Sequence, residues 1–105
     1  MTDDELAGLP NDLVSQIRNV LSCKPPIAES EVVLRQLEDL LKTNETATQY
    51  YRGLRIKYDQ PYYAHDRSTL MATAEKMLED TERTSNAAHS AIDAIRRHER
   101  GARDR

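Results

Sequence analysis

Hydrophobic residues recur at helical spacing in three segments of the chain, and two proline-containing breaks separate these segments. The breaks are Pro25-Pro26 and Pro61, because proline lacks a backbone N–H and disfavours helix in the residue before it. The pattern predicts helices over about 11–22, 30–59 and 67–100. No useful stretch alternates with the period of two that a half-buried strand requires. We therefore expect one all-α domain spanning residues 1–105.

The first predicted helix carries a single apolar stripe. Pro10 fits the first turn, where the missing N–H of a proline costs nothing. Residues 3–9 before it add at most one short turn. The stripe consists of Leu13, Val14, Ile17, Val20 and Leu21.

The second predicted helix has the most regular pattern, and Ser30 is its expected N-cap. Its apolar seam advances in alternating steps of four and three residues, which is the heptad spacing of coiled coils. Leu34, Leu41 and Ile56 widen this seam in places. The seam consists of Val33, Leu37, Leu40, Asn44, Ala47, Tyr51, Leu54 and Tyr58.

Two residues of the second predicted helix leave alternatives open. Asn44 is polar within the seam, so it either fixes the register of the packed helices or is a tolerated residue in a loosely packed middle. Gly53 costs about 1 kcal/mol relative to alanine inside a helix. It either permits close approach of another helix or is simply tolerated.

The third predicted helix has a weaker seam, with small and hydroxyl-bearing residues in its middle. Such residues permit close helix approach but bury little area, and burial contributes only about 25 cal/mol per Å². We therefore expect this helix to depend on another chain for part of its core. The seam consists of Met71, Ala74, Leu78, Thr81, Ser85, Ala88, Ile92 and Ile95.

The predicted helices are too long for a compact globule. At 1.5 Å per residue the second and third helices reach roughly 45 and 50 Å. A compact domain of 100 residues has a radius of gyration of only about 13 Å. We therefore expect an elongated three-helix hairpin or bundle with coiled-coil-like seams, in which the first helix folds beside the other two.

The composition supports a helical chain that needs a partner. Leu, Ile and Val number 20 of 105 residues, and Phe and Trp are absent, which is near the lower limit for building a core. The net charge of −3, with 3 Gly and 4 Pro, excludes a disordered polyelectrolyte and a low-complexity chain.

The positive charge gathers in a basic tail over residues 96–105. Five arginines there stand against Glu99 and Asp104, a local charge of +3 (five minus two). The favoured interpretation is a solvated helix end, where cations suit the helix dipole. The alternative is contact with an acidic partner or a nucleic acid. The pI near 5.6 disfavours direct nucleic-acid binding by the chain as a whole.

Several signals point to the cell interior. No run of 18 apolar residues could span a membrane. The acidic start, Asp3 to Glu5, fits neither a secretory signal nor a mitochondrial transit peptide. The single Cys23 excludes an internal disulfide and argues against a thiolate metal site.

No motif for chemistry is present. Three scattered glycines cannot form a phosphate-binding loop, and no residue spacing marks a nucleophile held by a base. We expect no enzymatic activity, no cofactor, no metal and no small-molecule substrate.

The most distinctive local feature is a tyrosine cluster. All five aromatic residues lie within fourteen positions, interleaved with Arg52, Arg55 and Lys57. Aromatic residues and arginine are the types favoured at the centres of protein interfaces. Basic and aromatic interleaving also occurs in single-stranded nucleic-acid platforms, but the surrounding acids disfavour that interpretation.

Some of these tyrosines can instead pack inside the chain. Tyr51 and Tyr58 lie on the seam and can pack within the chain, whereas Tyr50, Tyr62 and Tyr63 lie off it. The predicted partner-binding residues are Leu37, Leu40, Tyr50, Tyr51, Leu54, Arg55, Tyr58, Tyr62, Tyr63, Leu78, Ile92 and Ile95.

The stretch Leu37-x-x-Leu40 with the segment from Tyr51 to Asp59 (YRGLRIKYD) resembles subunit 30 of the Mediator complex. Residues 12–16 are similar to the first helix of that family, and Pro25-Pro26 to the break that follows it. The chain lacks the long polar insert that the family often carries before its last helix. The resemblance implies a nuclear, non-enzymatic subunit that helps to link transcription factors to RNA polymerase II.

A second resemblance lies in the last predicted helix. Asp66-Arg67-x-x-Leu70-Met71, followed by residues 75–81 (EKMLEDT), is similar to the start of a Qb-type SNARE helix. It implies a soluble SNARE-like or tethering component in vesicle trafficking. Under both resemblances the partners are other helical subunits. We expect a hetero-oligomer in preference to a homodimer, and the nucleus in preference to the cytoplasm.

Overall fold

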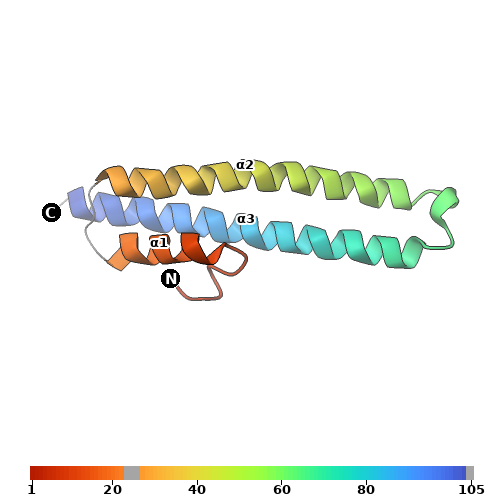
Figure 1. The fold of residues 1–105 in the computed structure, drawn as a ribbon, viewed down its shortest axis with the longest axis horizontal. Coiled ribbons are helices and arrows are strands. Elements are labelled where there is room, and N and C mark those ends of the chain that lie inside the picture. Colours follow the sequence, from red (N-terminus) through yellow and green to blue (C-terminus); the bar gives the residue numbers. More distant parts are fainter. Residues whose placement is uncertain (23–26, 104–105) are drawn as a thin grey trace.

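The computed structural model describes residues 1–22 and 27–103, with side chains for 1–22 and 29–101. It contains α1 (Asn11–Ser22), α2 (Ile27–Tyr58), a short 3₁₀ helix η1 (Pro61–Tyr63) and α3 (Arg67–Arg103) (Figure 1). No strand occurs within the described residues, which confirms the all-α prediction. Cys23 and Pro25-Pro26, on which two predictions depend, lie outside the described residues.

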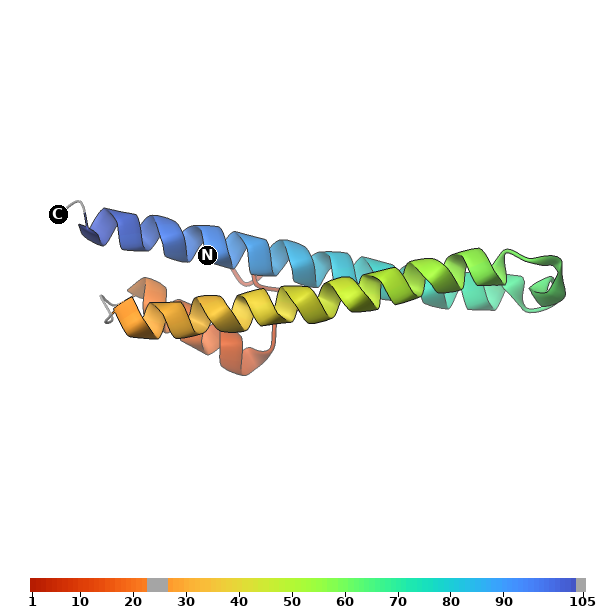
Figure 2. The same ribbon diagram turned by 90° about the horizontal axis from the view of Figure 1, so that it is seen from above.

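Helices α2 and α3 form a long antiparallel hairpin, and α1 lies beside only one half of it (Figures 1 and 2). The molecule measures 62 × 21 × 20 Å and has a radius of gyration of 17.8 Å, so the expected elongated shape is confirmed. We call the half with α1 the three-helix end (residues 1–22, 29–43 and 84–101). The other half, with η1, is the two-helix end (residues 44–83).

Three predicted boundaries need correction. Helix α2 begins at Ile27 and ends at Tyr58, so Ser30 is a buried residue inside the helix and not its N-cap. Proline restricts the residue before it rather than those after it, and a helix can therefore begin directly after Pro26. Helix α3 continues to Arg103, three residues beyond the predicted end.

The basic tail up to Arg103 is consequently part of α3. The Arg96 guanidinium lies 3.5 Å from a carboxylate oxygen of Glu38 in α2. The Arg97 side chain donates a hydrogen bond to the backbone carbonyl of Asp93 one turn earlier. Both contacts agree with the favoured interpretation of a solvated helix end.

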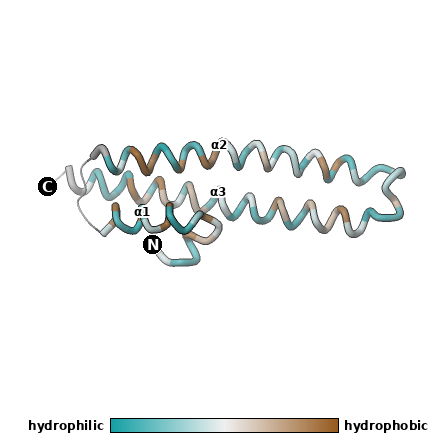
Figure 3. The backbone as a smooth tube through the Cα atoms, in the orientation of Figure 1, coloured by the Kyte–Doolittle hydropathy of each residue, from teal (hydrophilic) through white to brown (hydrophobic). Residues whose placement is uncertain are grey.

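The core lies at the three-helix end, where hydrophobic residues of all three helices meet (Figure 3). Every residue of the three predicted stripes is buried or half-buried. Ile56 is an exception among the residues predicted to widen a seam, because its side chain is 73% exposed. It lies two residues after Leu54, which turns it about 200° around the helix. The core cluster consists of Leu6, Leu9, Leu13, Ile17, Val20, Val33, Leu37, Ala87, Ala88, Ala91, Ile92 and Ile95.

The small residues of α3 bring the helices close together. Ala87, Ala88 and Ala91 are all buried, and α3 packs against both α1 and α2. Small side chains let another helix approach without leaving voids. At this end the core that we expected α3 to obtain from another chain comes from α1 and from the N-terminal segment.

The N-terminal segment, residues 1–10, folds back onto α3 in a way that the sequence analysis did not anticipate. Leu6 and Leu9 are buried in the core. Gly8 has a φ of +94°, and its carbonyl accepts a hydrogen bond of 3.2 Å from the Thr84 hydroxyl. An ion pair between Asp3 and Arg18 joins the segment to α1.

Asn44 fixes the alignment of α2 against α3. Its side-chain amide donates to the backbone carbonyl of Thr81 and to the Ser85 hydroxyl, both at 2.6 Å. A half-buried amide that satisfies its donors in this way favours one register, since sliding the helices would break both bonds. Of the two alternatives for Asn44, the register role is the one that the contacts support.

Gly53 has open space around it, because no atom lies within 4 Å of where a Cβ would be. Close approach of another helix inside the chain therefore does not require this glycine. No helix within the described residues has the length and apolar character that crossing a membrane would require.

Replacing Gly8 or Gly53 by alanine should have opposite effects on stability. At Gly8 the new Cβ would lie 3.0 Å from Thr84 Oγ1 at a positive φ, a conformation that costs roughly 1–2 kcal/mol. Gly53→Ala removes the helix penalty of glycine and should stabilise the protein by about 1 kcal/mol. Urea unfolding followed by circular dichroism measures both. Equal stability of Gly8→Ala and the unsubstituted protein would contradict the role given to this turn.

Asn44→Ala should lower the free energy of unfolding by about 1–2 kcal/mol, because the hydrogen bonds to Thr81 and Ser85 are lost. The matched control is Glu45→Ala, at the exposed neighbouring position, which should change stability by less than about 0.5 kcal/mol. Chemical denaturation at equilibrium distinguishes the two. An Asn44→Ala protein no less stable than the control would show that these bonds do not hold the register.

Candidate protein–protein interface

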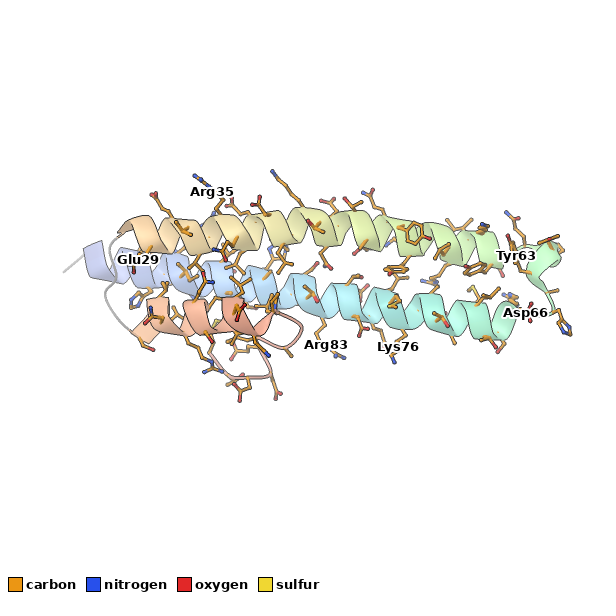
Figure 4. All side chains as sticks on the ribbon, in the orientation of Figure 1. Glu29, Arg35, Tyr63, Asp66, Lys76 and Arg83 are labelled. Atoms are coloured by element: carbon orange, nitrogen blue, oxygen red, sulfur yellow. The ribbon has the colours of Figure 1, made fainter. Side chains whose placement is uncertain are left out.

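A tight turn at the far end of the hairpin brings three tyrosines together. The chain leaves α2 in an extended conformation at Gln60 and enters η1 at Pro61, whose fixed φ suits the first position of a helical turn. Tyr63 N–H donates to the Gln60 carbonyl at 3.0 Å. This turn directs Tyr63 back toward Tyr58 at the end of α2 (Figure 4).

We call Tyr58, Tyr62, Tyr63 and Lys57 the aromatic tip. The Tyr63 ring meets the Tyr58 ring edge to face at 5.4 Å between centroids, and the Tyr62 ring in the same manner at 4.9 Å. The Lys57 ammonium lies 5.9 Å from the Tyr63 centroid, within the range of a cation–π contact. Such ring pairs contribute about 0.5–1.5 kcal/mol beyond their area burial.

The members of the aromatic tip differ in exposure. Tyr58 and Tyr63 are half-buried, whereas the Tyr62 side chain is 88% exposed. Tyr63 contacts both other rings of the cluster, and Tyr62 presents an almost fully exposed aromatic ring.

An ion pair spans the base of the turn. Asp59, just after α2, pairs with Arg67 at the start of α3. Both side chains are more than half exposed, so the pair adds little stability of its own. Its effect is to neutralise Asp59 beside the aromatic tip.

A shallow groove of about 380 Å³ lies next to the tip, between α2 and α3. Arg52, Arg55 and Ile56 of α2 form one wall together with Asp59 just after this helix, and Met71 contributes from α3. Arg52 also lines a larger groove of about 570 Å³ that continues toward the three-helix end. We call the first of these the tip groove.

The tip groove and the aromatic tip share a basic and aromatic character. Residues 50–67 carry Arg52, Arg55, Lys57 and Arg67 against Asp59 and Asp66, a local charge of +2 (four minus two), in a chain of net charge −3. Exposed aromatic and aliphatic groups beside arginine are typical of interface centres. The surface suits a partner segment that presents apolar groups flanked by carboxylates.

The predicted partner-binding residues fall into three groups. Leu37, Leu78, Ile92 and Ile95 are buried in the core of the chain itself, so the prediction that they contact a partner is wrong for this fold. Leu40, Tyr51, Leu54, Tyr58 and Tyr63 are half-buried. Tyr50, Arg55 and Tyr62 are exposed.

The reason for the error is that a heptad seam does not say which helix it packs against. The seams of α2 and α3 cover each other, which leaves the off-seam residues for any partner. Ile56 and Met71 line the tip groove but are not among the predicted partner-binding residues. For Ile56 the sequence did contain a signal. It lies two residues after the seam residue Leu54, so its side chain points away from the seam and toward the surface.

The described part of the chain offers no group of three or more His, Cys, Asp or Glu side chains that could hold a metal ion. No match was found for this chain among protein-family models, curated proteins or solved structures.

Proposed function

We propose that the chain is a non-enzymatic helical subunit of an intracellular multi-protein complex, and that it docks on other helical subunits through the aromatic tip and the tip groove. The observation that carries this proposal is the Tyr62 ring, 88% exposed and in edge-to-face contact with Tyr63. Tyrosine offers a large contact area with few rotatable bonds, and tyrosine and arginine are the residue types enriched among interface hot spots.

The two ends of the molecule support a division of roles. The three-helix end contains all members of the main core cluster. At the two-helix end, the buried residues are Ala74, Leu78 and Thr81. The two-helix end thus has the least internal burial and the greatest capacity for burial against a partner.

We further propose that the complex is a transcription coactivator of the Mediator kind, located in the nucleus. The support is the segment from Tyr51 to Asp59, which carries the resemblance to Mediator subunit 30. The same segment forms one wall of the tip groove through Arg52, Arg55, Ile56 and Asp59. Sequence resemblance and exposed surface therefore coincide at one place.

Affinity purification of the tagged full chain, followed by mass spectrometry, tests the identity of the complex. We expect coactivator subunits to be recovered with the unsubstituted chain and to be depleted with Ile56→Asp. Recovery of vesicle-trafficking proteins without transcription subunits would overturn the coactivator proposal and favour the SNARE-like alternative.

Tyr62→Ala should weaken binding of the recovered partner by about tenfold or more, because truncation of a hot-spot aromatic costs at least about 1.4 kcal/mol. The free energy of unfolding should fall by no more than about 1.5 kcal/mol, the contribution of the lost edge-to-face contact with Tyr63, because the ring is otherwise exposed. The matched control is Val32→Ala, 55% exposed at the three-helix end, which should leave affinity unchanged. An affinity loss for Val32→Ala as large as that for Tyr62→Ala would place the interface elsewhere.

A further inference from the structure

The N-terminal segment covers a strip along one side of α3 (Figure 1). Leu6 and Leu9 are 3% and 8% exposed and belong to the main core cluster. Gly8 between them lies against Thr84. Ala87, three residues further along α3, is 3% exposed and lines a groove between α3 and the segment. The N-terminal segment therefore buries two leucines on this strip and keeps the strip from solvent.

The charges of the N-terminal segment do not match the surface that it covers. The groove between them, of about 470 Å³, is lined by Asp4 and Glu5 of the segment and by Glu79 and Glu82 of α3. Arg83 is the single cation among the described residues that line it, which gives a local charge of −3 (one minus four). All four acidic residues are exposed. Like charges repel, most strongly at low ionic strength, so charge opposes the closed position of the segment.

Few polar contacts hold the N-terminal segment on α3. Within the described residues, the hydrogen bond from the Thr84 hydroxyl to the Gly8 carbonyl joins the two. The ion pair to α1 adds little, because the Asp3 side chain is 95% exposed. The hydrogen bonds between Thr2 and Glu5 lie inside the segment itself. Attachment of the segment therefore depends mainly on its two buried leucines.

We propose that the N-terminal segment is an autoinhibitory cover over a docking site for a partner segment. That partner segment has two leucines three positions apart and basic residues where this chain has Asp4 and Glu5. Its leucines fill the positions that Leu6 and Leu9 occupy, and its cations face Glu79 and Glu82 instead of another pair of carboxylates. Because the apolar contacts are the same for both occupants, charge favours the partner segment.

Covalent attachment favours the chain's own segment over any partner. A linked segment competes at an effective concentration of about millimolar. The apparent affinity of a partner falls in proportion to the fraction of molecules in which the site is open. The N-terminal segment therefore inhibits docking without preventing it, and its charge mismatch with α3 raises the open fraction.

This docking site is separate from the tip groove. Ala87 lies sixteen residues from Met71 along α3, which is about 24 Å, and the two grooves share no lining residue. Both surfaces can be occupied at the same time. Failure of one proposal therefore leaves the other intact.

Thiol labelling of the full chain measures how often the segment opens. In a Cys23→Ser background, Ala87→Cys places a thiol under the segment, and a small thiol reagent in excess reacts with it only when the site is open. The control is Ala88→Cys, at a neighbouring position that is 0% exposed and lies in the predicted seam of α3. We expect the thiol at position 87 to react at least tenfold faster than the one at position 88. Equal rates would overturn the opening of the segment.

Charge reversal tests the mismatch with the same labelling assay. Glu79→Lys with Glu82→Lys should slow the reaction at position 87 by about three- to tenfold, because two repulsive pairs become attractive. Asp4→Lys should act in the same direction, and the combination of all three should lose most of the gain. Glu29→Lys with Glu31→Lys, at exposed positions of α2, changes the net charge equally and should have no effect. Effects that simply add in the combined variant would overturn the mismatch.

Two synthetic peptides test the chemistry of the partner segment. One is residues 1–10 of this chain, and the other carries Asp4→Lys and Glu5→Lys. The protein is the full chain with Leu6→Asp and Leu9→Asp, which frees the site, and with the thiol at position 87. Circular dichroism checks that its helices remain, and Leu6→Ser alone is the milder substitution if they do not.

The lysine peptide should protect this thiol from labelling at least threefold more strongly than the unsubstituted peptide. The advantage should disappear in about 1 M NaCl, where charges are screened within about 3 Å. The chain with its own leucines should bind the lysine peptide at least tenfold more weakly, because its site is covered. Equal protection by the two peptides, or protection by a lysine peptide with both leucines replaced by serine, overturns the docking site and leaves the tip docking intact.

Discussion

The rest of the structure depends on the packing of Ile17, Leu37 and Ile95, one from each helix. They are the largest side chains that are completely removed from solvent. Each full burial of such a side chain contributes about 1.5–3 kcal/mol. Together the three side chains join α1 to the hairpin of α2 and α3. The position of α1 decides that the three-helix end has the main core and that the two-helix end leaves more of the surface of α2 and α3 exposed.

The alignment of α2 with α3 extends this arrangement to the far end. The amide of Asn44, at the border between the two halves, bonds Thr81 and Ser85. With the register set there, Ile56 of α2 and Met71 of α3 line the same groove near the tip. A shift of the register by one turn would move the two helices about 5 Å relative to each other and would separate the residues of the tip groove.

Much of the fold could be predicted because helices leave a strong periodic signal. The apolar stripes of α1, α2 and α3 were all placed on the correct faces. The start of α2 was misjudged, since polar residues such as Ser30 look like caps even where the helix has already begun. Leu6 and Leu9 were missed because a short irregular segment has no period, and the turn at Gly8 acts through a contact with distant Thr84.

The sequence by itself determined the class, the number of helices, their inner faces and the elongated shape, because these follow from local periodicity and length. Only the tertiary structure decided which apolar residues cover one another. Leu78 and Ile92 could equally have faced another chain, and they are buried within this one. The tertiary structure also decided that α1 covers only one half of the hairpin, because the position of α1 depends on contacts between segments far apart in the chain. The position of α1 in turn decides which tyrosines remain exposed.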